Sequence, residues 1–212
     1  MVEPTWAGRV GQAIVEKAGE SVTLFDMTAM ASQTIFTPDD LLRLEGEDKL
    51  YELIHGQLVE KDMSGRSNYV KTEVARLLSN AARASASGLV IMEQEIICFP
   101  WDPNHAPRPD IVFVKAGRLP PGDLPDGHLM LAPDLCVEVT SPNDRFRDVE
   151  NKISDYLRAG VQVIWIVVPE LRHVRVHRAD GTVDVYQQDK TVVLPTLIPN
   201  FSSRVGDFFP PL

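Results

Sequence analysis

The sequence predicts a protein with both helices and strands, α/β in the broad sense and α+β in the narrow one. Its core is expected to be a mixed central β-sheet flanked by helices. Two long segments have the apolar spacing of amphipathic helices, and short apolar runs typical of strands lie before, between and after them. The run VQVIWIVVP (161–169) is the most apolar in the chain, as expected for a strand that is buried on both faces. Shorter alternating runs follow it, which favours antiparallel additions to the same sheet.

The bulk composition limits the number of domains and the kinds of partner. With 212 residues, the chain is long enough for one domain with a full core. Residues 1–35 show no sustained period, so we expect an N-terminal extension there and a single domain over 36–212. The formal net charge of -9 argues against a broad phosphate-binding surface. Any contact with nucleic acid must therefore be local or assisted by metal ions.

The first elements of the domain are a short helix and a hairpin. Thr37 is a suitable N-cap for a helix that has Pro38 at its first position. The segment KLYELIHGQLVEKD (49–62) then predicts a hairpin that turns at His55 and Gly56.

The two long helices and the remaining strands follow. Residues 67–86 carry apolar side chains at helical spacing and predict the first long helix. The second runs from about Asp144 to Ala159 and ends at Gly160, which is a suitable C-terminal cap. Strands are expected near 90–98, 109–114 and 134–140, and after the second helix in VQVIWIVVP, HVRVHR, TVDVYQ and TVVLP. The segment RVGDFF predicts a closing helical turn.

Two carboxylates occupy unusual places in apolar strands. Asp110 follows Pro109 at the start of one strand, and Glu138 lies inside the strand DLCVEVT. An ionised group removed from water is costly unless it is paired or bound to metal. Taken singly, Asp110 can be a turn residue and Glu138 part of the solvated face of an edge strand. If the two strands are neighbours, both carboxylates meet at one edge of the sheet and form an oxygen site for Mg²⁺ or Mn²⁺.

A lysine on the second long helix adds a cation to this pair. On a helical projection, Lys152 lies just outside the apolar arc that contains Tyr156, so its stem can extend over the end of the sheet. The alternative is a solvated lysine that pairs with Asp148 or Asp155 at helical spacing.

The cysteines and histidines give weaker signals. Cys98 and Cys136 lie among apolar residues without metal-ligand spacing, which suits a reducing compartment. His173 and His177 stand four residues apart, but their segment alternates like a strand, which favours a polar strand face over a zinc site. No apolar run reaches membrane-spanning length and the N-terminus lacks a secretory pattern, so we expect a cytoplasmic protein without membrane contact.

The segments YELIHGQLVE, RPDIVFV, PDLCVEVTSPNDRFRDVENKISDYLRAGVQVIWIVVPE and VRVHR resemble, in order, the signature blocks of the Uma2 family of endonucleases. This family lies in the PD-(D/E)xK nuclease superfamily, and the resemblance covers about residues 37–209. It implies a restriction-endonuclease-like core. It also implies metal binding by Asp110 and Glu138 and a catalytic Lys152 supplied by the following helix. Glu52 resembles an acidic position that supports the site, and the alternative is an ordinary surface charge of the hairpin. The simplest superfamily pattern places the lysine two residues after the second acid, where this chain has Thr140.

The function that follows from this resemblance is Mg²⁺-dependent hydrolysis of phosphodiester bonds in nucleic acid, with DNA as the expected substrate and a homodimer as the expected assembly. The alternative is a catalytically inactive interaction module that keeps the nuclease fold. Six basic residues near the expected site could form a local phosphate-binding strip, or belong to a mixed solvated surface: Arg66, Lys71, Arg76, Arg108, Arg145 and Arg147.

Overall fold

The centre of the fold is a six-stranded mixed sheet with the order β3-β4-β5-β6-β7-β8. Its strands are β3 (Gly88–Met92), β4 (Ile111–Lys115), β5 (Leu135–Val139), β6 (Val163–Val168), β7 (His173–Arg178) and β8 (Val183–Gln187). Only β5 and β6 pair in parallel among these neighbours. A parallel pair needs a crossover connection, and helix α3 (Phe146–Ala159) provides it. The predicted fold class is confirmed.

This computed structural model describes residues 34–44, 49–61, 64–120, 124 and 127–211. Residues from Thr34 to the end of the chain group into a unit of their own. The extension expected over residues 1–35 lies outside the described residues, except for its last two positions. No helix of the described ranges is both long enough and apolar enough to cross a membrane.

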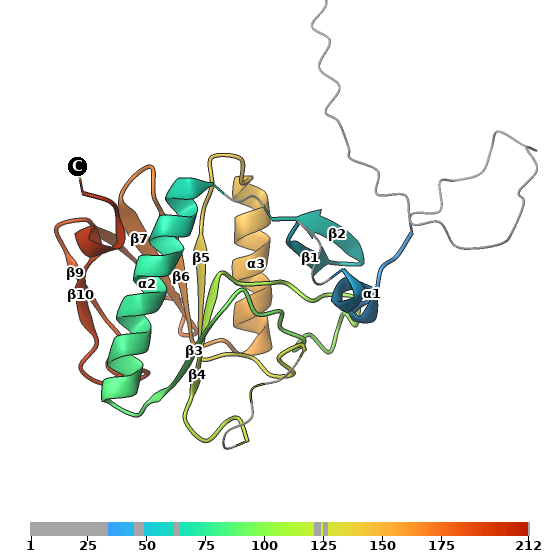
Figure 1. Ribbon diagram of the computed structural model, residues 1–212, viewed down its shortest axis with the longest axis horizontal. Coiled ribbons are helices and arrows are strands. Elements are labelled where there is room, and N and C mark those ends of the chain that lie inside the picture. Colours follow the sequence, from blue (N-terminus) through green and yellow to red (C-terminus); the bar gives the residue numbers. More distant parts are fainter. Residues whose placement is uncertain (1–33, 45–48, 62–63, 121–123, 125–126, 212) are drawn as a thin grey trace, which may run out of the picture. The chain divides into compact units, whose positions relative to one another are not determined.

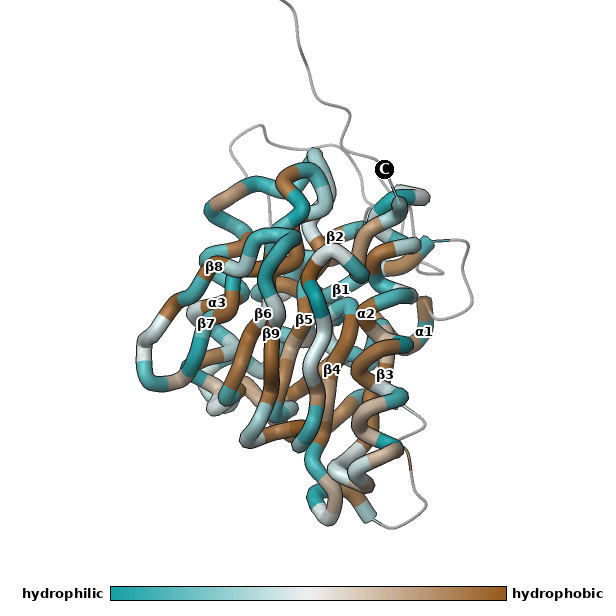
Figure 2. Tube along the Cα trace, turned by 90° about the vertical axis from the view of Figure 1, so that its left-hand side faces the viewer, coloured by the Kyte–Doolittle hydropathy of each residue, from teal (hydrophilic) through white to brown (hydrophobic). Residues whose placement is uncertain are grey.

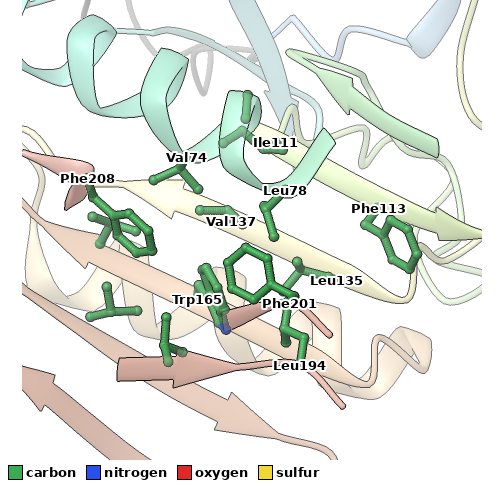
Figure 3. Packing of buried hydrophobic residues seen from close by; sticks show 14 of the residues in the cluster. Val74, Leu78, Ile111, Phe113, Leu135, Val137, Trp165, Leu194, Phe201 and Phe208 are labelled. Carbon is green, nitrogen blue, oxygen red and sulfur yellow. The ribbon is translucent and has the colours of Figure 1, made fainter. Parts of the chain in front are cut away.

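Helices α2 (Gly65–Ala84) and α3 cover opposite faces of the sheet (Figure 1). On one face, Val74 and Leu78 of α2 pack with Val137 of β5 and Trp165 of β6, as Figure 3 shows from close by. On the other face, Ile153 and Tyr156 of α3 pack against Cys136 and its neighbours. The alternation predicted for β5 is therefore confirmed, with Leu135, Val137 and Val139 on the α2 face and Cys136 on the α3 face.

The burial of the central strands follows from these two layers. Strand β6 is buried over five of its six residues, because it lies in the interior of the sheet and has helix or chain on both faces. Figure 2 shows the hydrophobic stretches running through the middle of the sheet, with hydrophilic residues in the outer turns. A side chain such as Trp165, fully buried here, contributes about 2–3 kcal/mol to the free energy of folding through removal from water.

The small elements lie at the two ends of the described chain. Helix α1 (Pro38–Arg43) begins with the predicted cap, and the Thr37 side chain and the Asp40 carboxylate form a reciprocal capping box. Strands β1 (Tyr51–Ile54) and β2 (Gln57–Glu60) form the predicted hairpin. Strands β9 (Thr191–Val193) and β10 (Ser202–Arg204) form a second two-stranded sheet, and the 3-10 helix η1 (Val205–Phe208) follows.

One strand is shorter than the sequence predicts, and another strand was not predicted. The strand expected over 90–98 ends at Met92, and Ile96 makes only an isolated bridge with Leu129. The backbone turns at Glu93, which has a positive φ of 49°. Strand β10 was not predicted because its short polar sequence SSR has no strand signal of its own.

Candidate active site

Strand register brings Asp110 and Glu138 to the same place. Strands β4 and β5 are antiparallel neighbours with Ile111 opposite Val137, so the next position along each strand is Asp110 on one side and Glu138 on the other. Asp110 Oδ2 accepts a hydrogen bond of 2.7 Å from the Val139 backbone N–H. This bond holds the Asp110 carboxylate against β5, on the side where Glu138 lies.

Helix α3 and the hairpin bring the other two predicted residues to these carboxylates. Lys152 Nζ lies 2.8 Å from Glu52 Oε1 and 3.4 Å from Glu138 Oε1. The second oxygen of Glu52 accepts a 3.1 Å hydrogen bond from the Arg108 backbone N–H. Glu52, Asp110, Glu138 and Lys152 all line one cavity of about 270 Å³. The solvated alternative for Lys152 is not what the structure shows, because its side chain is only 18% exposed and bridges two buried acids.

Three further charged residues surround Asp110. Lys61 Nζ lies 2.7 Å and Lys71 Nζ 2.8 Å from Asp110 Oδ1, and each ammonium also lies 3.0 Å from a carboxylate oxygen of Glu93. Lys61 also donates a 2.5 Å hydrogen bond to the Arg108 carbonyl oxygen. The side chains of Lys61 and Lys71 are 8% and 5% exposed. Asp110 is thus enclosed by two buried ammonium groups.

Lys61 and Glu93 were not predicted as site residues, and Lys71 was expected in a basic strip or on a mixed surface. At about 100° per residue, Lys71 falls between the buried Leu78 and Ala82 on the projection of α2, so its burial could have been found from the helical arc. Lys61 and Glu93 follow the ends of β2 and β3 and carry no periodic signal. Their proximity to Asp110 depends on how the hairpin and β3 meet β4, which a local pattern does not show.

The site thus contains two groups of charges, one neutral and one with a net negative charge. Around Asp110, two carboxylates meet two lysines, so the charges cancel. Around Lys152, the carboxylates of Glu52 and Glu138 share one ammonium, which leaves one negative charge in excess. Such an excess in a buried place is costly.

The pKa values follow this imbalance. Burial, together with the negative charges of Asp110 and Glu52, raises the pKa of Glu138 to about 7 against the opposing effects of Lys152 and Lys61. Burial also works against ionisation of Asp110, but Lys61 and Lys71 outweigh it and hold the Asp110 pKa below its usual range. Burial lowers the pKa of Lys152, yet Glu138 and Glu52 reverse this and raise it above the ordinary value. Glu138 is therefore the carboxyl of this group that titrates near neutrality.

The donor set of the cavity fits a hard divalent cation. Asp110 and Glu138 offer carboxylate oxygens, which Mg²⁺ and Mn²⁺ prefer. A cation beside Glu138 would offset the excess negative charge and return its pKa toward the ordinary range. Tyr156 supports this side, because its hydroxyl donates a 2.7 Å hydrogen bond to Glu138 Oε1 and orients the carboxyl group.

The predicted basic strip is only partly present. Lys71 is buried in the site, and Arg108 is buried in an ion pair with Glu95 and donates hydrogen bonds to the carbonyl oxygens of Tyr51 and Glu93. These two residues therefore belong neither to an exposed phosphate-binding strip nor to a solvated surface. Arg76 is exposed and pairs with Glu73. Arg66, Arg145 and Arg147 are exposed, and Arg145 lines the cavity.

Known structures share this architecture. A solved structure described as "Crystal structure of a putative nuclease belonging to DUF820 from Anabaena variabilis ATCC 29413" matches with a TM-score of 0.69 and 23% sequence identity. The match covers 82% of this chain and 97% of that chain. The chain therefore shares the α+β fold of that structure. The comparison with curated proteins found no match.

The family model of Uma2, described as "Putative restriction endonuclease", matches residues 38–206. The chain therefore belongs to the Uma2 family. The predicted resemblance is confirmed, and it covers nearly the whole of the range expected from the sequence blocks.

Proposed function

We propose that this protein is a metal-dependent endonuclease of the PD-(D/E)xK type that hydrolyses phosphodiester bonds in DNA. The observation that carries the proposal is the convergence of Glu52, Asp110, Glu138 and Lys152 on one cavity, from four separate parts of the chain. Membership of a family of restriction-endonuclease-like proteins supports the same reaction class.

In this proposal Asp110 and Glu138 hold Mg²⁺, with Mn²⁺ as a substitute. When bound, the cation supplies charge to the scissile phosphate and lowers the pKa of a water molecule. Lys152 keeps its proton at Nζ and orients the attacking water or stabilises the negative charge that develops on the phosphate. Glu52 positions Lys152 through their 2.8 Å ion pair, and Lys61 and Lys71 position Asp110.

In this proposal the substrate enters the cavity beside an exposed arginine, Arg145. Arg145 lies at the N-cap of α3 and lines the cavity, where its guanidinium can contact a phosphate next to the scissile one. The acidic chain offers few other such contacts, so we expect DNA binding to be weak and strongly dependent on salt. Cleavage of both strands of a duplex would require two copies of the site, and we propose a homodimer for that reason.

The test is a cleavage assay with supercoiled plasmid, linear duplex, single-stranded DNA and RNA, in Mg²⁺, in Mn²⁺ and with a chelator. Glu138→Gln is the most informative variant, because the native carboxyl already takes up a proton near neutral pH and the fold should tolerate a neutral isostere. We expect the cleavage rate to fall at least 100-fold in Glu138→Gln and in Lys152→Gln. Size-exclusion chromatography of each protein tests the proposed homodimer.

The matched control is Glu150→Gln on the same helix, whose carboxylate pairs with Arg175 outside the cavity residues. This control should cleave at the rate of the unmodified protein. Metal-dependent cleavage that persists undiminished in Glu138→Gln would refute the assigned site.

One observation favours the alternative, an inactive module that keeps the nuclease fold. Lys61 and Lys71 already neutralise Asp110, so a cation must compete with two ammonium groups for this carboxylate. Isothermal titration with Mg²⁺ and Mn²⁺ separates the two functions. Binding that is lost in Asp110→Asn supports the enzyme, and no binding by either protein supports the module.

A further inference from the structure

A second group of metal-ligating side chains lies outside the cavity. His55, Asp102 and His105 each offer one ligand atom, and these atoms lie within 4.8 Å of one another. Asp155 of α3 faces both imidazole rings. The group joins the turn of the β1–β2 hairpin, the loop before β4 and helix α3, so it connects three parts of the chain that a local pattern cannot relate.

The distances from Asp155 Oδ2 to the two imidazole Nε2 atoms match the spacing of ligands around one ion. Asp155 Oδ2 lies 3.5 Å from His105 Nε2 and 3.9 Å from His55 Nε2. Two ligands at about 2.0–2.1 Å from a tetrahedral Zn²⁺ are roughly 3.4 Å apart. Both distances are long for hydrogen bonds, yet each is within about half an ångström of the spacing between tetrahedral ligands.

His105 gives an independent sign that a ligand is required. The residue is only 1% exposed, and its Nε2 atom is buried without a hydrogen-bond partner among the described residues. A buried polar atom without a partner is uncommon and often marks the place of an ion or water. The unpartnered atom is the one that faces Asp155.

The surroundings hold the imidazoles in place. Asp102 Oδ2 lies 2.6 Å from His55 Nδ1, which is the arrangement in which a carboxylate orients a histidine that binds metal through its other nitrogen. The His55 turn is fixed by positive φ angles at His55 and Gly56 and by the 2.7 Å hydrogen bond from the Gly56 N–H to the Asn104 carbonyl oxygen.

The charges also favour a cation. Burial, followed by the neighbouring His55, lowers the pKa of His105 and so disfavours a positive charge on its imidazole. No lysine or arginine in the described part of the chain forms an ion pair with Asp102 or Asp155. In the cavity, by contrast, each carboxylate described above has a lysine partner.

We propose that His55, His105 and Asp155 bind a divalent transition metal, with Zn²⁺ as the expected ion, and that Asp102 orients His55. Imidazole ligands favour Zn²⁺ over the hard cations suited to the cavity. Binding requires the half-exposed His55 ring to tilt from its near-parallel stack on His105. Metal binding also breaks the long 3.4 Å contact from the His55 backbone N–H to His105 Nδ1.

The position of this site gives it a structural role. His55 and Asp155 lie three residues beyond Glu52 and Lys152 on the same hairpin and the same helix. An ion held between His55 and Asp155 therefore fixes the hairpin against α3 next to the Glu52–Lys152 ion pair. The proposal does not rest on the nuclease function, because it concerns a different set of ligands.

The test is isothermal titration of the chelator-treated full chain with ZnCl₂ at pH 7, with X-ray absorption spectroscopy of the loaded protein. We expect one Zn²⁺ per chain with nitrogen and oxygen ligands at about 2.0 Å, including two imidazoles. His55→Gln and Asp155→Asn should each weaken binding at least 100-fold, and Asp102→Asn should weaken it about 10- to 100-fold. These variants avoid the buried His105, whose replacement could impair folding.

Two controls separate this site from other metal-binding groups. His173→Gln on β7 should bind Zn²⁺ like the unmodified protein, and so should Glu138→Gln, which removes one of the two proposed metal ligands of the cavity. Zn²⁺ binding that is equally tight in His55→Gln, Asp155→Asn and the unmodified protein would overturn the proposal. So would binding that is lost in Glu138→Gln alone.

Discussion

The replacement of Glu138 by glutamine should make the protein's stability less dependent on pH. In the folded protein burial raises the pKa of Glu138 to about 7, whereas its ordinary value is 4.5. A carboxyl group whose pKa is raised by folding contributes fully to stability below pH 4.5, and this contribution is lost as the pH rises through 7. Glutamine has nearly the same shape, can accept the hydrogen bond from Tyr156 and does not ionise.

The size of the effect follows from the two pKa values. The difference between a pKa of 4.5 and one of about 7 corresponds to roughly 3 kcal/mol of ionisation free energy. Each pKa unit, a tenfold change in the dissociation constant, accounts for about 1.4 kcal/mol. Most of this change falls between pH 5 and pH 8, where we expect the free energy of unfolding of the native protein to drop by about 2–3 kcal/mol relative to Glu138→Gln.

Urea denaturation of both proteins at pH 5, 6, 7 and 8 measures this difference, since groups common to both proteins cancel in the comparison. Saturating Mg²⁺ should flatten the pH dependence of the native protein, because a cation beside Glu138 favours the ionised carboxylate. A difference in unfolding free energy between the two proteins that stayed constant over this pH range would refute the raised pKa of Glu138.

Three other changes test neighbouring parts of the structure. Lys61→Met removes a buried ammonium from Asp110 and should cost about 3–5 kcal/mol of stability in urea denaturation. Most of that loss should be recovered in the double variant with Asp110→Asn, and a double variant as unstable as the single one would contradict the pairing. Tyr156→Phe removes the hydrogen bond to Glu138 and should cost about 1–3 kcal/mol, more at pH 8 than at pH 5 because the ionised acceptor binds more strongly. Gly160→Ala, at a φ of 97° with open space around the new methyl group, should lower stability by about 1 kcal/mol in thermal denaturation, and an unchanged melting temperature would argue against the left-handed cap of α3.

Local patterns in the sequence were sufficient to predict the elements that contain the candidate site. The period of two in DLCVEVT places Glu138 on the face away from Leu135 and Val137, as the structure has it. The helical period of the segment after it places Lys152 beside the buried arc, with a stem long enough to reach Glu138. These features depend on neighbours a few residues apart, whose geometry the backbone conformation sets.

Only the tertiary structure decided which charges meet. Lys61 follows the hairpin and Glu93 follows β3, and they surround Asp110 because of how these elements approach β4, not because of any spacing along the chain. The same is true of His55, His105 and Asp155, which come from a turn, a loop and a helix. Long-range contacts of this kind follow from strand order and helix packing. The sequence alone therefore determined where the helices and most of the strands lie, apart from β10 and the end of β3. The packing of those elements determined which buried charge each side chain meets.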